Sequence, residues 1–153
     1  MRRARRAELG AVFGLIQQFH GSRLTPQQIT ERATSYGYLV AEADSQIAGA
    51  AGMLLTDSVA CIRDLATTDS DGGAAAIDAL LGSIEREAAE MVCEVVLVML
   101  PVASTSLALL LRERHYLYML LAQMKGFWRE VAAEHFPGVP GLWVYSLRSS
   151  KQK

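Results

Sequence analysis

A run of five small residues is the segment of this chain whose chemistry is easiest to predict. An apolar helical pattern begins within the run, after a strand-like segment and the polar turn "TTDSD". The first four backbone N–H groups of a helix have no partner inside it, and the aligned peptide dipoles place about half a positive charge there. A phosphate reaches these donors only where the side chains are small. The run predicts a diphosphate-binding turn made by Gly72, Gly73, Ala74, Ala75 and Ala76.

The same turn also fits a plain helix start. Ser70 or Asp71 is a suitable N-cap, and Asp69 and Asp71 suit the positive end of the helix dipole. The turn has no cation, and its two aspartates would repel an anion. These residues alone leave both interpretations open.

Other arrangements that carry chemistry are not evident in the sequence. His20, His115 and His135 share no ligand spacing, and the two cysteines do not form a metal-binding pair, so no metal site is predicted. Cys61 and Cys93 each lie in an apolar strand-like run, which favours buried free thiols in a reducing cytoplasm over a disulfide. No Ser-His-Asp or Cys-His set can be assigned.

Length and composition indicate one ordinary globular domain. The chain has 153 residues, 51% of them hydrophobic, and a formal net charge of −1. We therefore expect a single domain over 1–148 and a disordered tail over 149–153. The charge pattern predicts no binding to nucleic acid, and the longest apolar stretch is too short to cross a membrane. "MRRARR" precedes no apolar run of signal-peptide type, so we expect a cytoplasmic protein.

The hydrophobic periodicity predicts the elements that position the turn. Helical spacing occurs over 8–19 and 72–91, and capping residues indicate further helices over 25–35 and from about 104 to 116. Short apolar or β-branched runs predict strands at 36–43, 46–55, 58–68, 93–100, 118–128 and 141–148, with a short helix over 129–136 between the last two. Residues 2–6 suit an edge strand or a mobile terminus. A parallel crossover is expected where the helix over 72–91 joins two strands.

This order, β-α-α-β-β-β-α-β-α-β-β, resembles that of the general N-acetyltransferase (GNAT) superfamily. "IRDLATTDSDGGAAAIDALL" lies where that family has its pyrophosphate-binding loop, and "STSLALLLRERHY" is similar to its later helix, which ends in Gly-Phe. The resemblance implies an α+β fold with a mixed, mostly antiparallel central sheet and helices on both faces. It departs from the family's loop pattern at three positions, with Gly72 in place of Gln or Arg, Ala75 in place of the central Gly, and Ile77 in place of a final Gly or Ala.

The resemblance also implies acetyl-CoA as co-substrate and assigns roles to residues near the turn. Backbone amides of Leu65, Ala66 and Thr67 would polarise the thioester carbonyl, and Ser104 would bind the pantetheine arm or cap its helix. Residues 72–76 would bind the pyrophosphate.

In this family a carboxylate removes the proton of the acceptor amine and a tyrosine protonates the leaving thiolate. Asp64 is the candidate base, ahead of Glu42, although Asp64 also suits a surface or turn-anchoring role and water alone can accept such a proton. Leu111 occupies the tyrosine position, so Tyr116 is the candidate acid, with Tyr118 as a second choice. Aromatic residues entering a strand are more often packing residues.

Two functions follow from these expectations. The first is an N-acetyltransferase that transfers acetyl from acetyl-CoA to an amine of a small molecule or peptide. The alternative is a degenerate GNAT-like domain without catalysis that acts as a ligand-binding or dimerisation module. A homodimer through the last strands, near Trp128 and Trp143, is compatible with both.

Overall fold

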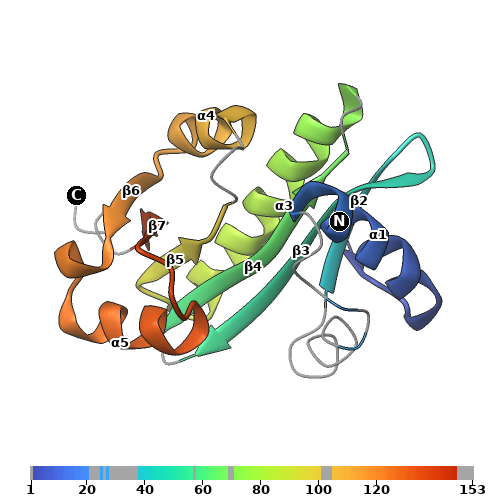
Figure 1. Cartoon of the computed structure of the whole chain (residues 1–153). Helices are drawn as coiled ribbons and strands as arrows, with labels where there is room; N and C mark the ends of the chain where they lie inside the picture. Colours follow the sequence, from blue (N-terminus) through green and yellow to red (C-terminus); the bar gives the residue numbers. More distant parts are fainter. Residues whose placement is uncertain are drawn as a thin grey trace. The chain divides into compact units, whose positions relative to one another are not determined.

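The computed structural model describes residues 2–20, 25, 27, 38–56, 58–68, 71–100 and 105–147. Figure 1 labels the main helices and strands along the chain. In chain order the elements are β1 (Arg2–Arg3), the 3-10 turn η1 (Arg6–Glu8), α1 (Leu9–His20), β2 (Tyr38–Ala43), β3 (Gln46–Thr56), β4 (Val59–Thr67), α3 (Asp71–Glu90), β5 (Val95–Val98), α4 (Thr105–Glu113), β6 (Leu117–Leu120), the 3-10 turn η2 (Leu121–Gln123), α5 (Gly126–His135) and β7 (Gly141–Ser146).

The strands form a seven-stranded sheet in the order β1-β2-β3-β4-β5-β7-β6. β2 runs antiparallel to β1 and to β3, and β7 runs antiparallel to β5 and to β6. β4 and β5 are parallel, which confirms that the connection through α3 is a crossover between parallel strands. The sheet is therefore mixed and mostly antiparallel, as expected from the sequence.

One element prediction is wrong. The strand expected over 118–128 ends at Leu120, because η2 follows it and α5 begins at Gly126. Within α5 the buried side chains are Trp128, Val131 and Ala132, which have the spacing of one helix face. The short helix expected over 129–136 is present and starts earlier than predicted.

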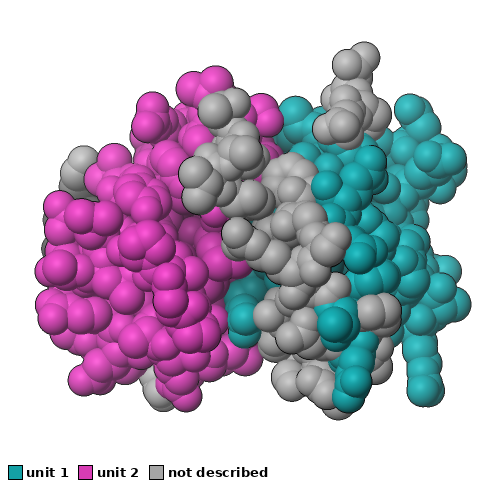
Figure 2. All heavy atoms as spheres, in the orientation of Figure 1, with its two compact units in different colours: residues 1–53, 63–84 teal, residues 54–62, 85–153 magenta. Residues whose placement is uncertain are grey.

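Residues 1–53 and 63–84 form one compact unit, and residues 54–62 and 85–153 form a second (Figure 2). The single domain expected over 1–148 stays a prediction. The tail over 149–153 and most of the helix expected over 25–35 lie outside the described residues.

One core cluster of unit 1 lies between α1 and the strands at the start of the sheet. Val12, Leu15 and Ile16 of α1 are buried against β2 and β3. Their spacing is the helical spacing that predicted α1. Partners in the same cluster are Tyr38, Val40, Ala50 and Ala66.

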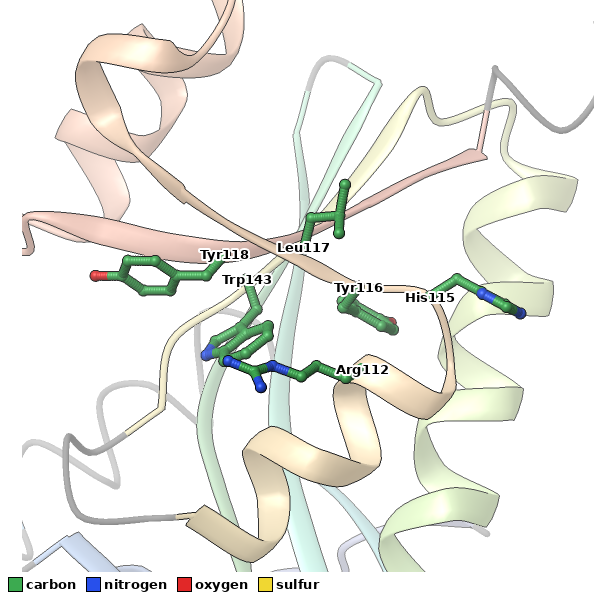
Figure 3. A pocket seen from close by; sticks show the side chains of 6 residues that line it. All are labelled: Arg112, His115, Tyr116, Leu117, Tyr118 and Trp143. Atoms are coloured by element: carbon green, nitrogen blue, oxygen red, sulfur yellow. The ribbon is translucent and has the colours of Figure 1, made fainter.

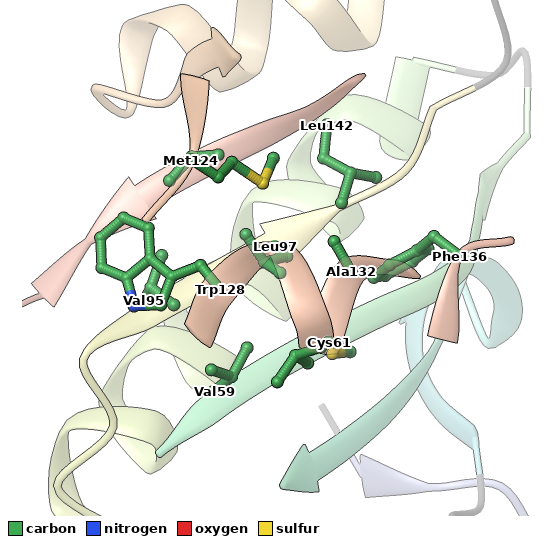
Figure 4. Close-up of a cluster of buried hydrophobic side chains, with 11 residues drawn as sticks. Val59, Cys61, Val95, Leu97, Met124, Trp128, Ala132, Phe136 and Leu142 are labelled. Carbon is green, nitrogen blue, oxygen red and sulfur yellow. The ribbon is translucent and has the colours of Figure 1, made fainter. Parts of the chain in front are cut away.

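The core of unit 2 lies between α5 and one face of β4, β5 and β7 (Figure 4). Alternate strand residues point into it, among them Cys61, Leu97 and Val144. Trp143 and Tyr145 have the opposite parity on β7, so they belong to the other face of the strand. Both cysteines are buried free thiols, and burial raises the pKa of Cys93.

No helix in the described part of the chain is long and apolar enough to cross a membrane.

Candidate functional site

The turn between β4 and α3 belongs to unit 1, and its small residues do not all face the same way. Gly73 and Ala76 are buried, whereas Ala74 and Ala75 are exposed and Gly72 is half-buried. The predicted run therefore divides into residues that pack on the protein and residues that face solvent. Asp71 is the first residue of α3, whereas Asp69 and Ser70 lie outside the described residues, so capping by Ser70 stays a prediction.

Gly73 allows α3 to start close to the end of β4. A Cβ at this position would lie 2.4 Å from the carbonyl oxygen of Thr68 and 2.5 Å from Oγ1 of Thr67. No side chain fits there without a shift of the backbone. Gly73 is thus required for strand-to-helix packing, independently of any ligand.

The end of β4 is fixed to β3 by bonds to one carbonyl. The Thr68 N–H donates to the carbonyl oxygen of Ala48 over 3.0 Å, and the Thr67 hydroxyl lies 3.2 Å from the same oxygen. The Thr67 hydroxyl also lies 3.2 Å from the carbonyl oxygen of Thr68. These contacts hold the chain where it leaves the sheet for the first turn of α3.

Packing inside unit 1 explains why Ile77 departs from the GNAT loop pattern. Ile77 is fully buried, and its Cδ1 lies 3.2 Å from where a Cβ of Gly49 on β3 would be. The bulk of Ile77 therefore fills space that Gly49 leaves on the sheet.

Asp64 forms an irregularity in β4. Its φ is 58°, in the left-handed region, and the parallel register of β4 with β5 runs from Val59 to Ile62, just before it. The Asp64 side chain is 2% exposed, and its Oδ2 accepts a 2.8 Å hydrogen bond from the hydroxyl of Tyr38 on β2. Left-handed backbone in a strand is typical of a bulge, which changes the direction of the residues that follow.

The predicted thioester-polarising residues directly follow this irregularity. Leu65 and Ala66 are buried, and Thr67 is half-buried. The structure thus places the three residues between the Tyr38–Asp64 hydrogen bond and the turn into α3. Glu42, the second candidate base, is exposed on β2.

Tyr116, the candidate acid, is 1% exposed and already donates its hydroxyl hydrogen. The acceptor is Oε2 of Glu85, at 2.9 Å, and Arg114 Nε donates to the same oxygen over 3.0 Å. Burial first, and then the Glu85 carboxylate, raise the pKa of Tyr116 well above its ordinary range. The ring stacks on Tyr145, with centroids 5.0 Å apart. These contacts indicate a structural role, and proton donation by Tyr116 stays a prediction.

The end of α4 explains why His115 stands where the GNAT helix has glycine. The Tyr116 N–H donates to Leu111 O and the His115 N–H donates to Arg112 O, which together form a Schellman motif. His115 has a φ of 73°, the left-handed conformation that this motif requires. Leu111, at the family's tyrosine position, is fully buried.

The other predicted residues are placed as follows. Ser104 lies outside the described residues. Trp128 is 6% exposed in the core of unit 2, and Tyr118 is 49% exposed on β6. Within the described part of the chain, no group of three or more His, Cys, Asp or Glu side chains is placed to hold a metal ion.

Sequence reasoning missed Tyr38, the partner of Asp64. The two residues are 26 positions apart, on β2 and β4, so only the assembly of the sheet brings them together. An aromatic residue at the start of β2 carries no local signal for that contact.

No sequence-family model matches the chain, and no curated protein matches it in sequence. Solved structures do match it in fold. A GNAT-family acetyltransferase from Staphylococcus aureus superposes with a TM-score of 0.75 at 10% identity, over 95% of this chain and 96% of that one. Rv2747 from Mycobacterium tuberculosis, solved in complex with CoA, superposes with a TM-score of 0.67 at 15% identity, over 95% of this chain and 98% of that one. N-acetylglutamate synthase from Neisseria gonorrhoeae, complexed with coenzyme A and N-acetyl-glutamate, superposes with a TM-score of 0.69 at 16% identity, over 95% of this chain and 34% of that one.

At these identities the comparisons define the fold alone: the chain has the GNAT acetyltransferase fold.

Proposed function

We propose that this protein is an N-acetyltransferase that transfers acetyl from acetyl-CoA to an amine of a small molecule or peptide. The observation that carries the proposal is the β4–α3 turn, in which Gly73 packs α3 against β4 while Ala74 and Ala75 are small and exposed in the first turns of the helix. Two of the proteins that share the fold were solved with CoA, which supports CoA as the ligand class.

The pyrophosphate would bind to backbone donors rather than to a side-chain cation. Gly72 stands where the GNAT pattern has Gln or Arg, so the amides at the start of α3 and the helix dipole supply the attraction. The aspartates of the turn oppose it through their charge, although solvent screens that repulsion. We therefore expect acetyl-CoA to bind more weakly than it would to a turn with a cation.

The chemical step requires polarisation of the thioester carbonyl. The amine nitrogen attacks the carbonyl carbon, the new C–N bond forms, the C–S bond breaks, and the CoA thiolate leaves. Backbone N–H groups of Leu65, Ala66 and Thr67 are the candidate donors to the oxygen that becomes negative. Water accepts the amine proton and returns one to the thiolate.

In this proposal the Tyr38–Asp64 pair has a positioning role. Because Asp64 is 2% exposed and is bonded to Tyr38, its carboxylate holds the irregularity of β4 instead of contacting the amine. The pair thereby orients the three residues that follow. Asp64 as the base stays the competing hypothesis, and substitutions described in the Discussion separate the two roles.

A thermal-shift titration with acetyl-CoA tests the proposal. At about 100 times Kd, bound ligand stabilises the fold by about 2.7 kcal/mol. For a chain of this length the melting temperature then rises by about 5 to 10 °C. No shift at millimolar acetyl-CoA would overturn the proposal.

A pair of matched variants tests the location of the site. Ala75→Asp places a negative charge beside the start of α3. Ala79→Asp places the same charge on the same helix face, four residues or about 6 Å further on. Ala75→Asp is expected to weaken binding at least about tenfold, and Ala79→Asp by about threefold or less. Equal effects of both variants would mean that acetyl-CoA binds elsewhere.

The second candidate function is a degenerate module that binds ligand without catalysis. It is favoured by Leu111 at the family's tyrosine position and by the bond of the Tyr116 hydroxyl to Glu85. Thiol release from acetyl-CoA, measured with a panel of primary amines and amino-terminal peptides, separates the two functions. Release that depends on an amine favours the enzyme, whereas binding without release favours the module.

A further inference from the structure

We infer that unit 2 has a binding pocket for a small planar carboxylate, formed between the C-terminal half of α4 and strands β6 and β7. The inference goes beyond the proposed acetyl transfer and does not depend on it. The pocket has a volume of about 560 Å³, the size of a small-molecule site (Figure 3). It is lined by Arg112, His115, Tyr116, Leu117, Tyr118 and Trp143.

Two aromatic rings form one side of this pocket. Tyr118 and Trp143 are paired across β6 and β7 and meet edge to face, with ring centroids 5.6 Å apart. The Tyr118 side chain extends over Gly141, two residues before Trp143 on β7, because a Cβ at Gly141 would be 2.5 Å from the Tyr118 hydroxyl oxygen. The absence of a side chain at Gly141 therefore lets the Tyr118 ring lie along the strand. Such rings offer flat apolar surfaces to a planar ligand.

Arg112 supplies the positive charge. Its guanidinium carbon lies 5.6 Å from the centroid of the Trp143 ring, and Figure 3 shows the two side chains next to each other. Arg112 is exposed, and among the residues that the structure describes no carboxylate forms an ion pair with it. Arg114, two residues later, differs because Glu85 binds it. A planar guanidinium beside an indole is suited to a carboxylate attached to a ring.

The remaining lining residues narrow the ligand class. None of these six described lining residues is acidic, so none of them would pair with a cationic ligand. The Tyr116 hydroxyl donates to Glu85, which leaves the ring rather than the hydroxyl for ligand contact. Figure 3 shows the His115 side chain directed away from Trp143. Arg112 is therefore the residue that distinguishes an anion from a neutral molecule of the same shape.

Calorimetric titration with two probes tests this inference on the whole chain. The probes are 4-nitrobenzoate and 4-nitrobenzamide, which have similar shape and differ in charge. We expect 4-nitrobenzoate to bind about tenfold more tightly, as one charge-assisted contact predicts. Equal affinity of the two probes, or no binding of either at millimolar concentration, would overturn the inference.

Matched substitutions test whether Arg112 binds the carboxylate of the probe. Arg112→Gln should remove the preference for the carboxylate. Lys125→Gln is the control, because Lys125 also lies over an indole, 4.9 Å from the ring of Trp128, but does not line the pocket. The control should keep the tenfold preference. An Arg112→Gln protein that still prefers 4-nitrobenzoate would overturn the assignment.

Fluorescence locates the bound probe. The chain has two tryptophans, so Trp128→Phe leaves Trp143 as the reporter, and 4-nitrobenzoate should quench it with the calorimetric Kd. If Trp128→Phe does not fold, since Trp128 is a core residue, the calorimetric comparison of wild type with the Arg112 and Lys125 variants decides alone. A dimer that forms through β6 and excludes both probes would overturn the inference in favour of a second copy of the chain.

Discussion

Replacing Gly73 by alanine should destabilise the protein, although alanine is the better helix former. The new Cβ would lie 2.4 Å from the carbonyl oxygen of Thr68 and 2.5 Å from Oγ1 of Thr67, about 1 Å closer than ordinary contact. Thr68 has little freedom to move because its N–H is bonded to Ala48 over 3.0 Å. The start of α3 must then shift away from β4.

Overpacking costs about 1 to 3 kcal/mol, and a 2.4 Å contact with a backbone carbonyl oxygen belongs in the upper part of that range, at about 2 to 3 kcal/mol. The helix propensity of alanine returns about 1 kcal/mol. The net loss of about 1 to 2 kcal/mol should lower the melting temperature by about 2 to 8 °C. The melting temperature is measured by circular dichroism at 222 nm during heating. Acetyl-CoA affinity should fall in the same variant, because the amides at the start of α3 move with the turn.

Gly14→Ala is the matched control. Gly14 is an exposed residue of α1, and a Cβ there would meet nothing within 4 Å. The same substitution should stabilise the protein by about 0.5 to 1 kcal/mol. A Gly73→Ala protein that melts as high as Gly14→Ala would refute the argument that Gly73 is needed for packing.

Three further predictions concern residues away from the turn. Val92, just after α3, has a φ of 60° and is 73% exposed. Val92→Gly should relieve this left-handed strain and raise the free energy of unfolding by about 1 kcal/mol, measured by urea denaturation. An unchanged urea midpoint would contradict this. Asp64→Asn keeps an acceptor oxygen for Tyr38, and asparagine tolerates the left-handed backbone. The rate of acetyl transfer should therefore fall less than about tenfold. A loss of a hundredfold or more would identify Asp64 as the base. The raised pKa of Tyr116, due to burial and Glu85, means that the unfolded chain loses this proton first. Stability should therefore fall as the pH rises above about 10, and Tyr116→Phe should flatten this slope between about pH 9 and 11; an identical slope in the variant would refute the assignment.

Much of the fold could be predicted because its elements carry strong local patterns. The helical stripe of α3 and the continuous apolar run of β5 were sufficient to place both elements and their parallel crossover. The segment after Leu120 was predicted wrongly as strand because its apolar residues are dense. Only the spacing of Trp128, Val131 and Ala132 indicates a helix.

Features that depend on distant residues could not be predicted. β7 pairs with both β5 and β6, although it is the last strand in the chain. The Tyr38–Asp64 hydrogen bond and the contact of Ile77 with Gly49 each join residues that no local pattern relates. The sequence did identify the small-residue turn, but only the structure shows that Gly73 is buried in it and Ala75 is exposed.

Direct titration of acetyl-CoA into the wild-type chain and into Ala75→Asp tests the central claim most directly. The proposal predicts saturable binding with one acetyl-CoA per chain, and an affinity at least about tenfold lower in Ala75→Asp. Absence of binding to the wild type at millimolar acetyl-CoA, or equal affinity in the two proteins, would contradict the assignment of the β4–α3 turn as a pyrophosphate site.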